Sequence, residues 1–423
     1  MNEVRLIGDN IGRRHVEAAL KTWIDGLGSK PGRVLLIPPD LTRSHSQAGP
    51  IVQILYKMLA PDAKVDIMPA LGTHVAMSAE ENASMFGTDI PSECFLVHNW
   101  RTDVAKIGEV PASYVAEISD GMVDYPIDVE INRRLLDPGY DLILSIGQVV
   151  PHEVVGMANY SKNILVGCGG KGMIDKTHFL GAVYGMERLM GRDYSPVRLV
   201  FDYAEKHFLC RLPLHYILTV TTAENDQAVI RGLFAGRDRS LFEDAVKLSQ
   251  KHNFDLLDRP LKKAVVYLDP KHFRSTWLGN KAIYRTRMAI ADGGELIIIA
   301  PGVKQFGEDP LVDVLIRKYG YTGTPRVLEM VKHNEDLAGN LSAAAHLIHG
   351  SSEGRFEITY APGHLTREEI EGVGFRYMPL SEALSMYDIH VLKDGYSTVN
   401  GEEVFFVSNP ALGLWSLADH FRN

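Results

Sequence analysis

Residues 33–74 read RVLLIPPDLTRSHSQAGPIVQILYKMLAPDAKVDIMPALGTH, and this stretch decides the fold class. Two short apolar runs, at 33–37 and 64–68, have the length and the Val, Leu and Ile content of buried strands. Between them, residues 48–59 place apolar side chains at helical spacing. A strand, a helix and a second strand in this order predict a parallel sheet with helices on both faces.

The same alternation continues along the chain. Further strands are expected at 93–97, 140–146 and 163–166, followed by a β-ribbon at 214–236 and a helix at 240–252. After a charged, proline-containing stretch, the pattern restarts with strands expected at 265–269 and 295–302 and a helix at 280–294. A chain of 423 residues is too long for one ordinary core. The sequence therefore predicts an α/β protein with two domains, 1–262 and 263–423, each with a mostly parallel sheet flanked by helices.

Composition narrows the class of partner. The formal net charge of -9 argues against nucleic acid and anionic membranes, because both require a positive protein surface. No run of about 18 apolar residues is present. The three cysteines, Cys94, Cys168 and Cys210, are too few and too scattered for a disulfide framework. We expect a cytoplasmic protein without a membrane partner, and a small anionic substrate remains open.

Polar side chains follow three of the expected strands directly. Asp40 and Arg43 come after the first, His74 after the second and His98 after the third. Arg43 could bind a carboxylate or phosphate through two hydrogen bonds, and a histidine can act as acid or base near neutral pH. Structural roles are the alternative, with Asp40 capping a turn and the histidines in the core. Because parallel strands share one carboxyl edge, these residues predict a common ligand site.

The segment HEVVGMANYSKNILVGCGGKGMIDKTHF, at 152–179, has several interpretations. Its GCGGKG loop fits the G-x-G-x-x-G pattern of dinucleotide-binding proteins, but Glu187 falls in a helical stretch rather than at the end of a second strand. Met173 replaces the lysine of a Walker A loop. His152 opens an H-E-x-x-H motif, but Gly156 stands in place of the second histidine. Spacing alone leaves open whether a histidine here binds metal.

Taken together, these segments resemble lactate racemase and its homologues, which use a nickel-pincer nucleotide. The resemblance covers nearly the whole chain in the same order. It rests on D-x-T-R at 40–43, GTH at 72–74, His152 with Lys162 ten residues later, His178 sixteen residues beyond that, and a K-A-x(10)-G-G segment that starts at Lys281.

The resemblance implies a role for each matching residue. The cofactor of this family is a pyridinium-3-thioamide-5-thiocarboxylic acid mononucleotide that carries nickel. Lys162 resembles the lysine that attaches it covalently, His178 the histidine that ligates nickel, and His74 and His152 the two acid/base histidines. We expect the other contacts as follows: Gly169 and Gly170 at the cofactor, and Arg43, Lys281, Asp40, His98 and Trp277 at the substrate.

The implied activity is racemisation or epimerisation of a 2-hydroxy acid by proton-coupled hydride transfer. Residues 1–262 would bind the cofactor and catalyse, and residues 263–423 would close over the substrate, with the active site in the cleft between them. Cofactor-biosynthesis proteins would be needed as partners for maturation. Two alternatives stay open: an NAD-dependent 2-hydroxy acid oxidoreductase that uses the GCGGKG loop, and a non-catalytic binding protein on the same fold.

The sequence departs from the family at one position of the second domain. Lactate racemases usually have a glutamine three residues before the lysine that Lys281 matches, whereas this chain has Leu278 beside Trp277. Loss of a polar donor there favours a larger 2-hydroxy acid or a sugar acid over lactate. Neutral packing of Leu278 is the alternative.

Overall fold

The computed structural model describes residues 3–224, 227–411 and 413–421, and its contacts divide the chain into two compact units. Unit 1 consists of Met1–Leu180 and Leu189–His252, and unit 2 of Gly181–Arg188 and Asn253–Asn423. The predicted α/β fold class is confirmed. Unit 1 ends at His252, before the boundary predicted at residue 262. The assignment of Gly181–Arg188 to unit 2 was not expected from the sequence.

Unit 1 is built on a six-stranded sheet of order β1-β10-β9-β6-β2-β3. Its strands are β1 (Val4–Ile7), β2 (Arg33–Ile37), β3 (Lys64–Ile67), β6 (Leu142–Gln148), β9 (Leu214–Glu224) and β10 (Gln227–Gly236). The pairs β9–β6, β6–β2 and β2–β3 are parallel, whereas β1–β10 and β10–β9 are antiparallel. The loops that follow β6, β2 and β3 therefore leave the same edge of the sheet.

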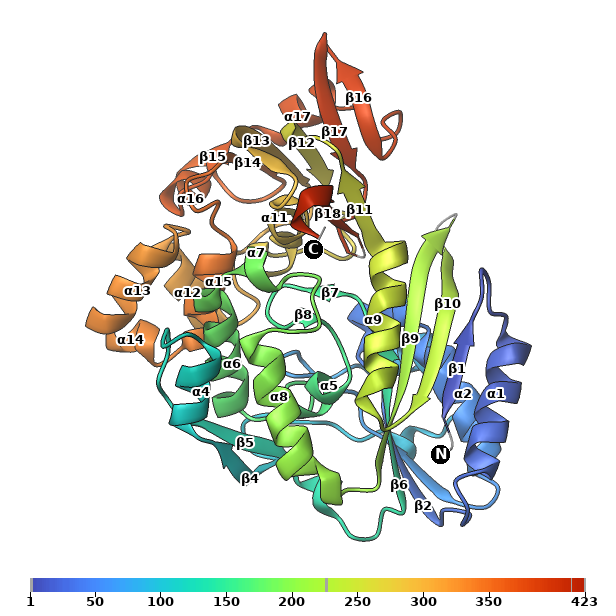
Figure 1. Ribbon diagram of the computed structural model, residues 1–423. Coiled ribbons are helices and arrows are strands. Elements are labelled where there is room, and N and C mark those ends of the chain that lie inside the picture. Colours follow the sequence, from blue (N-terminus) through green and yellow to red (C-terminus); the bar gives the residue numbers. More distant parts are fainter. Residues whose placement is uncertain (1–2, 225–226, 412, 422–423) are drawn as a thin grey trace. The chain divides into compact units, whose positions relative to one another are not determined.

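Helices cover both faces of this sheet (Figure 1). The helices of unit 1 are α1 (Arg13–Asp25), α2 (Ala48–Leu59), α3 (Ala79–Phe86), α4 (Ala112–Ile118), α5 (Ser161–Leu165), α8 (Pro196–His207) and α9 (Arg239–Asn253), together with the first part of α6 (Lys171–Tyr184). Successive side chains of a strand point to opposite faces of the sheet, so each face has its own set of packed residues. Val34 and Leu36 pack with α1 and α2 in one core, while Gly232 faces Leu248 of α9 on the other side.

Two of the predicted strands of unit 1 are wrong. Residues 163–166 fall in and just after α5, and residues 93–97 contain a short 3₁₀ helix, Ser92–Cys94. Only Phe95 of the second segment bridges β3, through a parallel pairing with Ile67. Both runs are short and apolar, and periodicity cannot separate a buried strand from a single buried helical turn at that length. Two hairpins that were not predicted, β4–β5 (Val104–Val110, Ile127–Asn132) and β7–β8 (Pro151–His152, Gly156–Met157), complete the strands of this unit.

Unit 2 contains a second six-stranded sheet, of order β15-β14-β13-β12-β17-β16. Only β16–β17 is antiparallel. Its strands are β12 (Leu261–Tyr267), β13 (Ile290–Ala300), β14 (Glu357–Pro362), β15 (Arg376–Tyr377), β16 (Gly395–Val399) and β17 (Glu402–Val407), and β11 (Phe254–Leu257) pairs separately with β18 (Leu414–Leu417).

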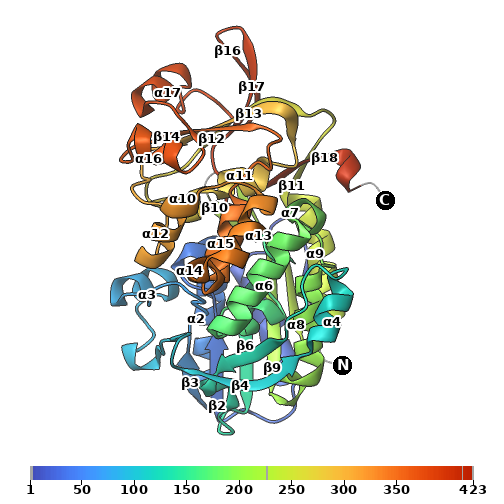
Figure 2. The same ribbon diagram turned by 90° about the vertical axis from the view of Figure 1, so that its left-hand side faces the viewer.

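Helices also lie on both sides of this second sheet, with α17 on one side and α11 on the other (Figure 2). The helices of unit 2 are α10 (Thr276–Gly279), α11 (Lys281–Thr286), α12 (Pro310–Tyr319), α13 (Thr324–His333), α14 (Glu335–Ala338), α15 (Leu341–His349), α16 (Arg367–Gly372) and α17 (Leu380–Met386), and most of α7 (Met186–Leu189) also belongs here. The helix predicted at 280–294 is too long, because β13 already begins at Ile290. Among the described residues, no helix combines the length and the apolar character needed to cross a membrane.

Candidate functional site

Three loops at one edge of the unit 1 sheet carry four of the predicted site residues. Asp40 and Arg43 follow β2, His74 follows β3 and His152 follows β6. A parallel bridge between Pro39 and Ala70 extends the pairing of β2 and β3 beyond the strands. The strand order therefore brings these residues together, as the rule for parallel sheets predicts.

Asp40 is the centre of the first group. It is 3 % exposed, its carboxylate hydrogen-bonds Nδ1 of His74, and Nη1 of Arg43 lies 3.8 Å from Oδ1. The backbone N–H of Thr42 donates to the same oxygen at 3.1 Å. Burial raises the pKa of Asp40, but the His74 contact and the Arg43 charge outweigh it and hold the pKa well below its usual range. Asp40 is therefore a carboxylate at neutral pH.

The Asp40 contact decides which nitrogen of His74 is free. A carboxylate can only accept a hydrogen bond, so Nδ1 of His74 is the donor and carries the proton. In the neutral ring, Nε2 then has a lone pair and can accept a proton from a ligand. His74 is oriented as a general base.

His152 has the opposite orientation. It lies on the β7–β8 hairpin, is 8 % exposed, and its Nδ1 accepts the backbone N–H of Val154 at 3.1 Å. Burial lowers the pKa of His152 well below its usual value, and the charges of Lys162 and Arg43 act in the same direction. A neutral ring whose Nδ1 accepts carries its proton on Nε2. His152 is thus oriented as a hydrogen-bond donor.

Lys162 lies on α5, directly after an unusual turn. Asn159 and Tyr160 have φ values of 68° and 57°, a left-handed conformation that non-glycine residues seldom adopt. Burial lowers the pKa of Lys162 to about 7, with the Arg43 charge as the next cause. A large share of this amine is therefore uncharged and nucleophilic at neutral pH.

His178 lies on α6, within the part of this helix that belongs to unit 1. Its Nδ1 donates to the carbonyl of Ile174 at 2.6 Å, which leaves Nε2 free. Burial lowers the pKa of His178, so the ring is neutral, and neutral imidazole is the form that binds metal. The described residues contain no group of three or more His, Cys, Asp or Glu side chains that could hold a metal ion. A metal at His178 would need most of its ligands from another molecule.

Close packing explains why glycines occupy positions of the GCGGKG loop. A Cβ atom at Gly169 would lie 1.8 Å from the backbone oxygen of Leu165, and one at Gly170 would lie 2.4 Å from Oε2 of Glu130. The backbone at Leu165 cannot give way, so a larger residue does not fit at Gly169, whereas at Gly170 the Glu130 side chain would have to move. The close approach is to the protein's own atoms, and a contact of either glycine with a cofactor stays a prediction.

His98 supports this loop. Its Nε2 contacts the carbonyl of Gly169 at 3.2 Å, and its Nδ1 contacts Nδ2 of Asn132 at 2.9 Å. Because the amide nitrogen must donate, Nδ1 accepts and Nε2 donates, and both ring nitrogens are occupied. His98 therefore helps to hold the Gly169 backbone, and its predicted substrate contact stays a prediction.

The remaining predicted residues belong to unit 2. Trp277 lies on α10, with its ring 4.3 Å from that of His346, and Lys281 is the first residue of α11. Leu278 has an apolar side chain, and its backbone N–H donates to Oγ of Ser275 at 3.3 Å. The substrate contacts predicted for Trp277 and Lys281 stay predictions.

Arg198 contacts the segments that carry His152 and Lys162, and it was not expected from the sequence. Arg198 of α8 is fully buried and hydrogen-bonds the turn before Lys162. It follows Lys162 by more than thirty positions and belongs to no motif, so only the folded arrangement reveals it.

Comparison with known proteins supports this description. Residues 13–189 match the family model "Lactate racemase N-terminal domain", which confirms the predicted resemblance over a span that contains all the predicted site residues except Trp277 and Lys281. The search of curated proteins found no match for the chain.

Two solved structures share the fold. A crystal structure of a Thermotoga maritima protein is similar with a TM-score of 0.85 and 24% identity, over 97% of this chain and 100% of the other. The lactate racemase apoprotein from Thermoanaerobacterium thermosaccharolyticum is similar with a TM-score of 0.70 and 17% identity, over 95% of this chain and 92% of the other.

Proposed function

We propose that the protein is a racemase or epimerase of 2-hydroxy acids that uses a covalently attached nickel-pincer nucleotide. One observation carries the proposal: unit 1 brings together an oriented base, an oriented donor, a lysine with a pKa of about 7 and a histidine with a free Nε2. An ordinary dinucleotide site explains none of these four features.

The residues fit such a cofactor. The amine of Lys162 would form the thioamide bond, since it is substantially uncharged at neutral pH. Nε2 of His178 would complete a nickel coordination whose other donors come from the cofactor, and imidazole suits nickel. When bound, the cofactor supplies an acceptor for the hydride from the substrate carbon.

The chain's own residues would handle the substrate and its proton. The Arg43 guanidinium would bind the substrate carboxylate, and Asp40 holds the His74 ring in place. Nε2 of His74 would accept the hydroxyl proton, and the Nε2–H of His152 would donate to the substrate oxygen. We propose a small anionic substrate larger than lactate, with the cofactor-making proteins as maturation partners.

The attachment is tested by mass spectrometry of protein co-expressed with the cofactor-making enzymes. We expect added mass on the peptide that contains Lys162, and no added mass in Lys162→Arg. Lys171→Gln is a matched control, because Lys171 pairs with Asp175 on α6 and should leave the modification intact. Active protein with unmodified Lys162 would contradict the proposal. The loaded enzyme can then be screened with chiral 2-hydroxy acids and sugar acids.

A further inference from the structure

The guanidinium of Arg198 joins two segments that carry site residues. Its Nη2 donates to the carbonyl of Met157 at 2.7 Å and to that of Asn159 at 3.4 Å. Its Nη1 donates to Oγ of Ser161 at 3.3 Å. Met157 belongs to the β7–β8 hairpin, while Asn159 and Ser161 belong to the turn before Lys162.

Each of these segments is tied closely to one site residue. In the hairpin, Met157 pairs with Pro151, the neighbour of His152, and His152 pairs with Gly156. In the turn, Ser161 is the neighbour of Lys162, and the strained Asn159 presents its carbonyl to Arg198. One planar side chain thus fixes the hairpin and the turn relative to each other.

The environment of Arg198 is unusual for a residue that only fills space. The side chain is 0 % exposed, and its hydrogen-bond acceptors are neutral oxygens. The guanidinium lies over the ring of Phe242 at 4.4 Å. Burial lowers the pKa of Arg198 to about 10, and the charge of the Asp202 carboxylate is the main effect that opposes burial. Burying a cation is costly, and an apolar side chain of similar size would fill this position at lower cost.

We propose that Arg198 is a positioning residue that holds the His152 hairpin and the Lys162 turn in one fixed arrangement. This inference builds on the proposed function, in which Lys162 must meet the cofactor in a defined orientation. It goes beyond that function because it assigns a role to a residue whose hydrogen bonds go to the protein's own hairpin and turn.

The charge of Arg198 supports this role. Several ionisable groups act on the Lys162 amine: Arg43, Glu153, Arg198 and Asp40. Burial has the largest effect, and among the charges Arg43 and Arg198 both favour the neutral amine. Arg198 therefore holds the turn before Lys162, and its charge favours the neutral, nucleophilic form of the Lys162 amine.

The test measures acetylation of Lys162 in the cofactor-free protein at pH 7.5 by the N-hydroxysuccinimide ester of acetic acid. Peptide mass spectrometry gives the rate for Lys162 relative to that for the exposed Lys262 of unit 2. We expect Arg198→Gln to lower this ratio at least about threefold, because a nearby cation and the anchoring hydrogen bonds are lost. Arg198→Lys keeps the charge but loses the planar guanidinium, and its acetylation ratio should lie between those of wild type and Arg198→Gln.

Arg239→Gln is the matched control, since Arg239 pairs with Asp202 and Glu243 and does not touch the turn. Melting temperatures show which variants fold. An unchanged or higher ratio in folded Arg198→Gln would show that Arg198 neither favours the neutral amine of Lys162 nor orients it, and would overturn the proposal. The assay needs no cofactor, and its outcome is therefore separate from the mass-spectrometric test of cofactor attachment.

Discussion

At the scale of single residues, backbone and carboxylate partners decide what each histidine can do. His74 and His152 are of the same residue type and both follow parallel strands of one sheet. In His74, the Asp40 carboxylate at Nδ1 leaves Nε2 as a hydrogen-bond acceptor. In His152, a backbone N–H at Nδ1 leaves Nε2 as a donor. Nε2 of His74 can therefore take up a hydroxyl proton and give the same proton back, while the neutral His152 ring offers a hydrogen bond and keeps its only N–H proton.

The Asp40 carboxylate should contribute to stability in a pH-dependent way. Its pKa in the folded protein is lower than the ordinary value of 3.8, so its contribution is present above about pH 4 and is lost as the pH falls. We expect Asp40→Asn to be about 2 kcal/mol less stable than wild type at pH 7. The difference should shrink clearly at pH 2, as measured by urea unfolding, because most of the contribution persists until the pH approaches the lowered pKa.

An exposed carboxylate provides the control for this measurement. Asp62 pairs with Lys30 at 2.8 Å, with 60% and 83% of the respective side chains exposed. Asp62→Asn should therefore change stability little at either pH. Equal stability losses for Asp40→Asn at pH 7 and pH 2 would show that its carboxylate charge is not the cause.

At the scale of elements, the short helix α5 and the loop before α6 are held by close backbone packing. The N–H of Gly72 donates to the carbonyl of Gly167 at 2.9 Å, which ties this loop to the segment that carries His74. The carbonyl of Gly169 accepts from His98. The glycines therefore serve the loop's own packing, whatever ligand it meets.

Gly169→Ala should destabilise the protein by about 2 kcal/mol or more, because its Cβ would lie 1.8 Å from the backbone oxygen of Leu165. Gly172→Ala is a suitable control. There the nearest atom is the flexible end of Glu130 at 3.2 Å, and alanine favours a helix. Thermal unfolding of the two variants measures the difference, and equal melting temperatures would contradict the steric explanation.

This steric conflict also affects the NAD alternative. A bulky residue at Gly169 would disturb the fold before any ligand could be tested. Direct titration of the unmodified protein with NADH is therefore the better discriminator.

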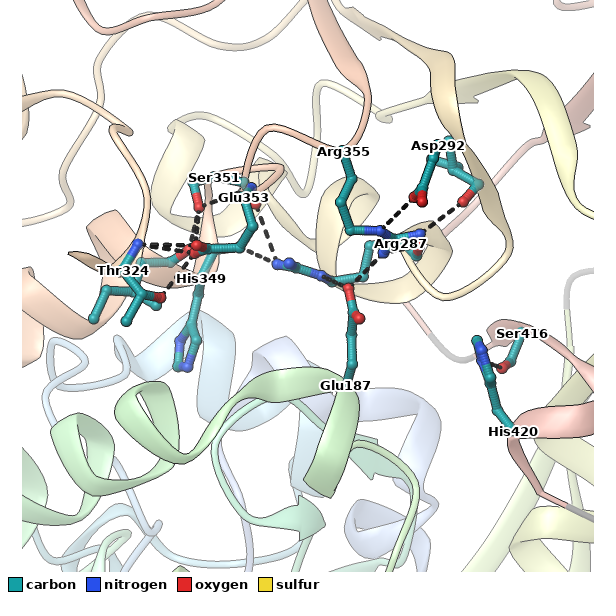
Figure 3. A network of polar contacts seen from close by, with 12 residues as sticks. Glu187, Arg287, Asp292, Thr324, His349, Ser351, Glu353, Arg355, Ser416 and His420 are labelled. Atoms are coloured by element: carbon teal, nitrogen blue, oxygen red, sulfur yellow. Dashed lines mark hydrogen bonds and ion pairs between the residues drawn. The ribbon is translucent and has the colours of Figure 1, made fainter. Parts of the chain in front are cut away.

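At the scale of the whole molecule, a short piece of the first half of the chain belongs to unit 2. Figure 3 shows Glu187, from this piece, between Arg287 and Arg355. Its Oε1 accepts from Nε of Arg287 at 3.0 Å and from Nη1 of Arg355 at 2.7 Å. The Arg287 side chain is only 5% exposed and also donates to the carbonyls of His349 and Ser351. Residues 181–188 are therefore held in unit 2 by charge as well as by packing.

Glu187→Gln should destabilise unit 2 by about 1 to 3 kcal/mol, since a nearly buried guanidinium loses its counter-charge. Hydrogen exchange of the peptide 181–188 should become faster. The matched control is Glu357→Gln, which breaks an ion pair with Arg376 in the same unit. Both of its partners are largely exposed, so the loss should be below about 1 kcal/mol. Similar effects of the two variants would mean that burial does not strengthen the Glu187 contacts.

The sequence by itself determined the fold class, because helical and strand periodicities follow directly from side-chain burial. It also identified, by order and residue type, Asp40, Arg43, His74, His152, Lys162 and His178, which the structure brings into one unit. It misjudged 93–97 and 163–166, where three or four apolar residues suit a strand or a helical turn equally well.

Only the tertiary structure decided the roles. It showed that both nitrogens of His98 are occupied, that His74 and His152 present opposite proton states, and that Arg198 spans the hairpin and the turn. The physical reason is the same for His74, His98 and Arg198, whereas the partner of His152 is its near neighbour Val154. A hydrogen bond depends on which atoms meet in space, and residues 34 or more positions apart meet only after the sheet has set their distances.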